Sequence, residues 1–135
     1  MKGRKPEITA LPGALDTPPS APTWLPKFAK KEWARVVPAL VRARSLASHE
    51  LSTVESYCIA VARVRECEAV IQKHGLTYVS PTGESKRRPE STLAKENIEA
   101  ARRLAAELGI TPASRSKNKG GAPEHDNEDE FGVDI

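Results

Sequence analysis

The chain has 135 residues and a formal net charge of +3, and 39% of its residues are hydrophobic, 4% aromatic and 29% charged. Eleven residues are Pro, six of them within the first 26 positions, so about 90 residues, roughly 24 to 112, remain to build a core. A core of this size is marginal for a monomer, and we therefore expect the chain to oligomerise.

Three further features exclude a secreted or membrane protein. No apolar run approaches the ~18 residues of a membrane span, and no signal peptide is recognisable. Cys58 and Cys67 are nine residues apart in one predicted helix, so they point to opposite sides and cannot bridge each other. These features predict a soluble intracellular protein with reduced thiols.

The charge is distributed unevenly along the chain. Residues 123 to 135 contain six Asp and Glu residues and no Lys or Arg, so this end carries −6 and the preceding residues carry +9. A basic body with an acidic tail indicates a polyanionic partner such as nucleic acid, although such a tail can also serve solubility alone. We interpret residues 117–135 as a flexible acidic tail.

Residues 1–23 are predicted to form a disordered, basic and Pro-rich arm. Its tip, Lys2-Gly3-Arg4-Lys5-Pro6, is similar to short Gly-Arg-Pro elements that lie in AT-rich minor grooves. A cation inserted there is favourable because the narrow groove concentrates negative potential. Lys2, Arg4 and Lys5 are therefore candidate DNA contacts, and a solvated terminus is the alternative.

The first helix is predicted from about Pro26 to Arg44. Its apolar residues, among them Trp33, Val37 and Leu40, gather on one side of a helical wheel. Pro38 removes one helical hydrogen bond and is expected to kink the helix. The opposite side is purely basic, which favours phosphate contact over an ordinary solvated face. This stripe consists of Lys27, Lys31, Arg35 and Arg42.

The second helix is predicted to begin after Ser48 as N-cap and to end near His74, where Gly75 stops it. At about 26 residues it is long for so small a domain, and we expect it to bury its extra surface against a partner chain. The short connector between the first two helices fits a helix-turn-helix as well as a plain helical hairpin.

A hairpin or extended loop is predicted over residues 76–90, because Leu76 to Val79 has strand character and Pro81 to Glu84 has turn chemistry. Its basic triplet, Lys86, Arg87 and Arg88, is a second candidate DNA patch or a solubilising group. The third helix is predicted to begin near Ser91 or Thr92 and to end before Gly109. Its predicted core face consists of Leu93, Ala94, Ile98, Ala101, Leu104, Ala105 and Leu108.

Patterns that indicate catalysis are lacking in the sequence. The three His residues are not spaced as metal ligands, and no phosphate-cradling Gly-rich loop with a Lys is present. Asp16 is the only Asp before the acidic tail, whereas two-metal nuclease chemistry needs clustered carboxylates. We predict no catalytic residue, no metal site and no cofactor.

The chain resembles the small terminase subunits of tailed bacteriophages and prophages over residues 3 to about 117. The resemblance rests most specifically on Leu108 to Arg115, which read LGITPASR. It also rests on the arm tip, Trp33, residues 37–40 (VPAL), residues 56–58 (SYC) and Gly75. It implies a non-enzymatic packaging factor in the host cytoplasm that forms rings, recognises concatemeric viral DNA and regulates the large ATPase and nuclease subunit.

The predicted fold is mainly α, a three-helix domain with a kinked first helix, a long second helix, a hairpin or loop, a third helix and flexible termini. Residues 24–116 are expected to hold DNA binding and oligomerisation, the latter through the second helix, the loop and the third helix. The expected partners are double-stranded DNA, the large terminase subunit and copies of the same chain, with no membrane. A dimeric helix-turn-helix regulator is the alternative, although the second helix begins without Arg, Asn or Gln to read bases.

Overall fold

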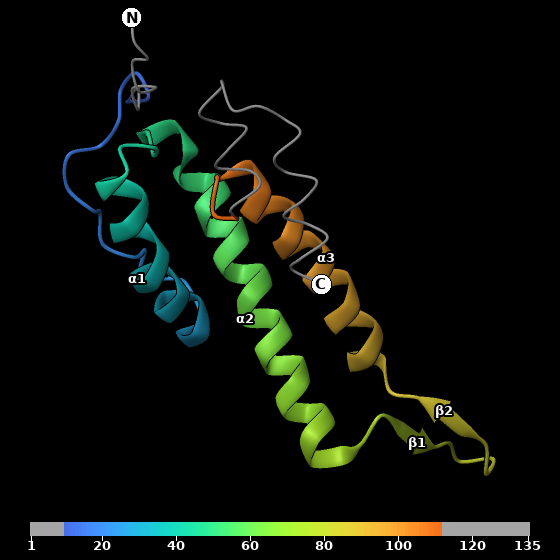
Figure 1. Ribbon diagram of the computed structural model, residues 1–135. Coiled ribbons are helices and arrows are strands. Elements are labelled where there is room, and N and C mark those ends of the chain that lie inside the picture. The colour runs from blue at the N-terminus through green and yellow to red at the C-terminus, as the bar shows by residue number, and fades with distance from the viewer. Residues whose placement is uncertain (1–9, 112–135) are drawn as a thin grey trace, which may run out of the picture.

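The computed structural model describes residues 10–111 as three helices and a two-stranded hairpin. Helix α2 (Leu51–His74) is the central element, and α1 (Lys27–Arg42) and α3 (Pro89–Glu107) both pack against it. In Figure 1, α1 and α3 lie on either side of α2, and the hairpin extends beyond the far end of α2. The prediction of a mainly helical three-helix domain is confirmed.

Helix α1 buries the apolar side that its sequence pattern predicts. Trp33, Val36, Val37 and Leu40 are buried against α2 and the neighbouring segments, because residues three and four apart share one helix face. The helix is shorter than predicted at both ends, with Pro26 as its N-cap, and it continues through Pro38.

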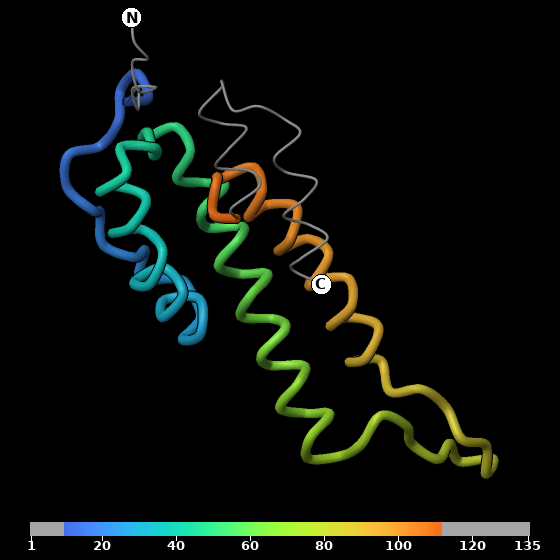
Figure 2. Tube along the Cα trace, viewed as in Figure 1, coloured from blue at the N-terminus to red at the C-terminus, as the bar shows by residue number. Residues whose placement is uncertain are grey.

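The segment before α1 differs from the disordered arm predicted for residues 1–23. Residues 10–26 run alongside α1 (Figure 2) and are tied to it and to the following turn. The Trp33 indole donates to the carbonyl of Pro19 (2.9 Å), and the Leu15 amide donates to the carbonyl of Leu46 (2.8 Å). Leu25 is buried in the core. The prolines restrict φ and so reduce the entropy lost on ordering, which lets a few apolar contacts hold this segment.

Both ends of α2 are set by local backbone chemistry. A short 3₁₀ turn, Ser48–Glu50, precedes the helix, and the Glu50 carboxylate accepts the backbone N–H of Ala47 (2.9 Å). Ser48 is therefore not the cap that the sequence predicted. At the other end α2 stops at His74, as predicted, because Gly75 adopts a φ of 92°, which side chains with a Cβ disfavour.

The hairpin consists of β1 (Thr77–Val79) and β2 (Ser85–Arg87), with Tyr78 opposite Lys86. Helix α3 then starts at Pro89, earlier than predicted, because Pro is well suited to the first helical position. Its predicted core face is only partly buried: Ala94 and Ala105 are buried, whereas Leu93 and Ile98 are exposed. Leu93 and Ile98 lie in the half of α3 nearest the hairpin, and neither belongs to the main core cluster.

Candidate nucleic-acid interface

The basic stripe predicted on α1 lies on the surface of the folded chain. Lys27, Lys31, Arg35 and Arg42 are all exposed. The two lysine ammonium groups lie 5.5 and 5.9 Å from the centre of the Phe28 ring, within cation–π range. The stripe therefore places four exposed cations along one helix.

Helix α2 adds a fifth cation that the sequence analysis missed. The Arg65 guanidinium lies 6.0 Å from the centre of the same Phe28 ring. The sequence gives no signal for this approach, because it depends on how α1 crosses α2. We call the resulting surface the cationic face; it consists of Lys27, Lys31, Arg35, Arg42 and Arg65.

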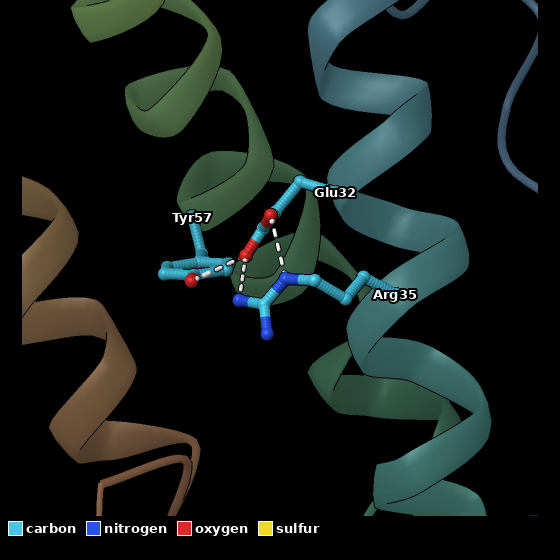
Figure 3. Close-up of polar contacts among 3 residues, drawn as sticks. All are labelled: Glu32, Arg35 and Tyr57. Atoms are coloured by element: carbon cyan, nitrogen blue, oxygen red, sulfur yellow. Dashed lines mark hydrogen bonds and ion pairs between the residues drawn. The ribbon is translucent and has the colours of Figure 1, made fainter.

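A buried carboxylate lies directly behind the cationic face. Glu32 is 4% exposed and is the only buried charged residue among those described. It accepts hydrogen bonds from Arg35 Nε at 3.0 Å and from Arg35 Nη2, and the Tyr57 hydroxyl of α2 donates to its Oε2 at 2.6 Å (Figure 3). Three side chains from two helices thus form one hydrogen-bonded group.

The pKa values within this group follow from burial and pairing. Burial by itself raises the pKa of Glu32, but the hydrogen bonds from Arg35 and Tyr57 and the charges of Arg35 and Arg65 outweigh it, so the pKa is lowered. Burial and the hydrogen bond to Glu32 raise the pKa of Tyr57 to about 12. Glu32 is consequently ionised and Tyr57 neutral at physiological pH.

Sequence reasoning missed this group because it counted Arg35 as a free member of the stripe. The sequence nevertheless indicates that Glu32 is buried. It precedes the apolar residues Val36 and Leu40 by four and eight residues, so it lies on the same face of the helix as they do. A carboxylate at such a position needs partners. Tyr57, also at an apolar position of its helix, is one of them.

The three basic residues of the hairpin differ in their contacts within the chain. Arg88 donates to the carbonyls of Gly75 (2.8 Å), His74 and Thr77 (both 3.2 Å) and so joins the end of α2 to β1. Lys86 lies 3.8 Å from Glu84, and Arg87 is exposed on β2. Arg88 therefore stabilises this junction, and Lys86, Arg87 and Arg88 all remain candidate DNA contacts.

Lys2, Arg4 and Lys5 lie outside the described residues, as do the turn predicted from Pro112 onward and the acidic tail. The structure places Lys27, Lys31 and Arg65 around the Phe28 ring, and Arg35 and Arg42 further along α1. Lys86 and Arg87 lie at the opposite end of the molecule, on the hairpin (Figure 1).

A second surface feature is apolar and lies around the hairpin and the first half of α3. Val79 is 72% exposed, Leu93 46% and Ile98 51%, and Tyr78 and Leu76 are also exposed. We call Val79, Leu93 and Ile98 the apolar end. These exposed aliphatic side chains on the hairpin and α3 are candidate contacts with another protein surface.

Neither a metal site nor a membrane span is present in the part of the chain that the structure describes. Over residues 10–111, no group of three or more His, Cys, Asp or Glu side chains is arranged to hold a metal ion. Over the same residues, no helix combines the length and apolar character that a membrane crossing requires.

Cys58 and Cys67 are both buried and unbridged, and burial raises the pKa of the Cys58 thiol to about 12.

A family model described as "Phage terminase, small subunit" matches residues 29–125, which include α1, α2, the hairpin and α3. No curated protein and no solved structure gives a significant match.

Proposed function

The chain belongs to the family of phage terminase small subunits, and on that premise we propose that it is the DNA-recognition subunit of a genome-packaging terminase. In this role the subunit has no catalytic activity of its own. It assembles into a ring of identical chains, binds double-stranded viral DNA, delivers that DNA to the large ATPase and nuclease subunit, and regulates that subunit. The observation that carries the proposal is the cationic face, present in a chain of this family.

DNA binding through this surface is electrostatic and directed at the phosphate backbone. Four of the five cations belong to α1. The fifth, Arg65, belongs to α2 and lies beside Phe28 of α1. Neutralising several phosphates at once releases condensed counterions, which makes the affinity strongly dependent on salt. Contacts of this kind position DNA without reading its sequence.

Ring formation is supported by the apolar end. Leu93 and Ile98 occur at core spacing on α3 and yet are exposed in the single chain. A second copy of the chain is the occupant we propose, because a core this small gains stability when subunits pack together. We assign both DNA binding and assembly to residues 24–116, with residues 1–23 as an arm that adds Lys2, Arg4 and Lys5 and residues 117–135 as an acidic tail.

The proposal predicts that charge removal from α1 reduces the salt dependence of DNA binding. Lys27→Gln, Lys31→Gln and Arg42→Gln are combined in one variant, because all three side chains are exposed. Affinity for a double-stranded oligonucleotide is measured by fluorescence anisotropy over a range of salt concentrations. The slope of log K against log[salt] should become shallower by about 2 to 3, at roughly 0.9 per lost phosphate contact.

The matched control removes the same charge elsewhere. Lys73→Gln, Lys95→Gln and Arg103→Gln are combined, since all three side chains are exposed on α2 and α3 away from the cationic face. This control should keep the slope of the unsubstituted protein. Equal slopes for both triple variants would contradict DNA contact through the cationic face.

A further inference from the structure

Arg35 differs from the other cations of the cationic face in having a fixed orientation. Its Nε and Nη2 atoms face Glu32, whereas Nη1 makes no hydrogen bond to any described residue and points away from the other two side chains (Figure 3). The side chain is 64% exposed despite this pairing. The edge of the guanidinium that carries Nε and Nη2 is thus occupied by Glu32. The free edge, which carries Nη1, is presented to solvent.

The carboxylate that orients Arg35 is itself held by the core. Glu32 is buried, and the hydroxyl of the buried Tyr57 fixes its Oε2 from α2. The other two arginine–glutamate pairs at the same spacing, Arg63 with Glu66 and Arg102 with Glu99, have both partners exposed. Exposed pairs of that kind exchange readily with water. Among the described arginines, Arg35 is the one oriented by a buried carboxylate.

The free edge of Arg35 lies on a surface of one sign. Lys31 is one helical turn before it, and Arg65 is close enough for its charge to lower the pKa of Glu32. The carboxylate of Glu32 already accepts three hydrogen bonds, two from Arg35 and one from Tyr57. An anion with two oxygens in one plane is the ligand that matches the free edge, because the guanidinium fork binds carboxylates and phosphates in two-point geometry.

We propose that Arg35 is a pre-oriented ligand for a backbone phosphate of DNA, and that Glu32 and Tyr57 are its positioning residues. The inference rests on the proposed function and specifies which cation of the cationic face makes the directional contact. Because its orientation is set before binding, Arg35 loses less side-chain entropy on contact than the free lysines do. Arg35 therefore contributes more to affinity than Lys27 or Lys31 individually.

The test uses a substitution for which an electrostatic account and the positioning account predict opposite changes in DNA affinity. Glu32→Gln removes a negative charge from behind the cationic face, so a purely electrostatic account predicts tighter binding to DNA. The positioning account predicts that DNA binding weakens by about three- to tenfold, because the guanidinium of Arg35 is no longer held in one orientation. The salt slope should stay unchanged in this variant, because Arg35 keeps its own charge.

Three further test variants and one control variant are measured in the same way. Arg35→Gln should weaken binding more and reduce the slope by about 0.9, and Arg35→Lys should weaken binding with the slope retained. Tyr57→Phe keeps every charge and should weaken binding without a change of slope. Glu66→Gln is the matched control, because it frees an exposed arginine in the same spacing and should not weaken binding. Circular dichroism establishes that each variant is folded.

The outcomes separate this inference from the proposed function. Weaker binding by Glu32→Gln or Tyr57→Phe at an unchanged slope supports the positioning role. Arg35→Lys is a surface substitution, and binding equal to that of the unsubstituted protein would overturn the inference even if Glu32→Gln failed to fold. Tighter binding by a folded Glu32→Gln variant would overturn it as well. A protein that bound no double-stranded DNA under any salt condition would overturn the proposed function and the inference together.

Discussion

At the scale of single residues, Glu32 connects the stability of the core to the cationic face. A buried carboxylate is costly unless it is paired and hydrogen-bonded, and Glu32 meets this condition with Arg35 on its own helix and Tyr57 on α2. The same contacts that stabilise its charge determine where Arg35 points. A change in the protonation of Glu32 therefore affects both folding and the surface.

The lowered pKa of Glu32 predicts a specific acid sensitivity. A carboxyl group whose pKa is lower in the folded than in the unfolded chain stabilises the fold above its unfolded pKa, and this contribution is lost as pH falls through the folded pKa. Urea unfolding should show Glu32→Gln to be less stable by about 1–3 kcal/mol near neutral pH. The difference should shrink as the pH falls below the unfolded pKa of a glutamate and through the lower folded pKa of Glu32, because Glu32 then becomes protonated in the unsubstituted protein. A difference that stayed constant over this range would contradict the role assigned to Glu32.

At the scale of elements, the junction between α2 and the hairpin depends on Arg88. Its guanidinium donates to three carbonyls at 2.8 to 3.2 Å, two of which belong to the last residue of α2 and to Gly75. Carbonyls at a helix C-terminus lack intrahelical partners, so Arg88 satisfies them and fixes the direction in which the hairpin leaves the helix.

Removal of this contact should loosen the hairpin selectively. In Arg88→Ala, amide hydrogen exchange over residues 77–87 should accelerate by about three- to tenfold, corresponding to the loss of about 1 kcal/mol. Amides in the first half of α2 should be unaffected. Arg87→Ala is the matched control, because Arg87 is an exposed neighbour without such contacts. Equal exchange in the two variants would show that Arg88 does not hold the junction.

The elements themselves could be predicted largely from the sequence. Apolar spacing located the three helices, and Gly75 and Gly109 marked where α2 and α3 end, because both adopt positive φ. Residues 10–23 differ from the predicted disordered arm because Pro-rich composition was taken as a sign of disorder, although the carbonyl of Pro19 accepts a hydrogen bond from the buried Trp33. Periodicity also placed Leu93 and Ile98 in the core, whereas both are exposed, since an apolar pattern does not show which of its positions another element covers.

The candidate site was predicted less completely than the fold. The stripe on α1 follows from a helical wheel, and its four cations are exposed as expected. The approach of Arg65 to Phe28 and the bond from Tyr57 to Glu32 join residues 37 and 25 positions apart. Such contacts depend on how two helices cross, which no local pattern specifies.

At the scale of the whole molecule, the two proposed contact surfaces lie apart. The cationic face centres on α1 and the middle of α2, whereas the apolar end lies at the hairpin and the first half of α3 (Figure 1). Subunits can therefore pack through the apolar end while the cationic face stays open to DNA. This separation is the physical basis of the proposed ring.

Disruption of the apolar end should dissociate the ring without unfolding its subunits. Leu93→Gln combined with Ile98→Gln replaces exposed side chains, so the helical signal in circular dichroism should be retained while the assembly falls apart. Trp24→Gln is the control, because Trp24 is an exposed aromatic residue before α1, away from the hairpin. An assembly unchanged by the double substitution would exclude the apolar end as the subunit contact.

Native mass spectrometry of the full chain tests the central claim most directly, because each subunit adds 14.7 kDa. The proposed function predicts one predominant closed assembly of many copies, and the Leu93→Gln, Ile98→Gln variant should reduce it to smaller species. A dimer would favour the helix-turn-helix regulator instead, and a monomer at every concentration tested would contradict the ring.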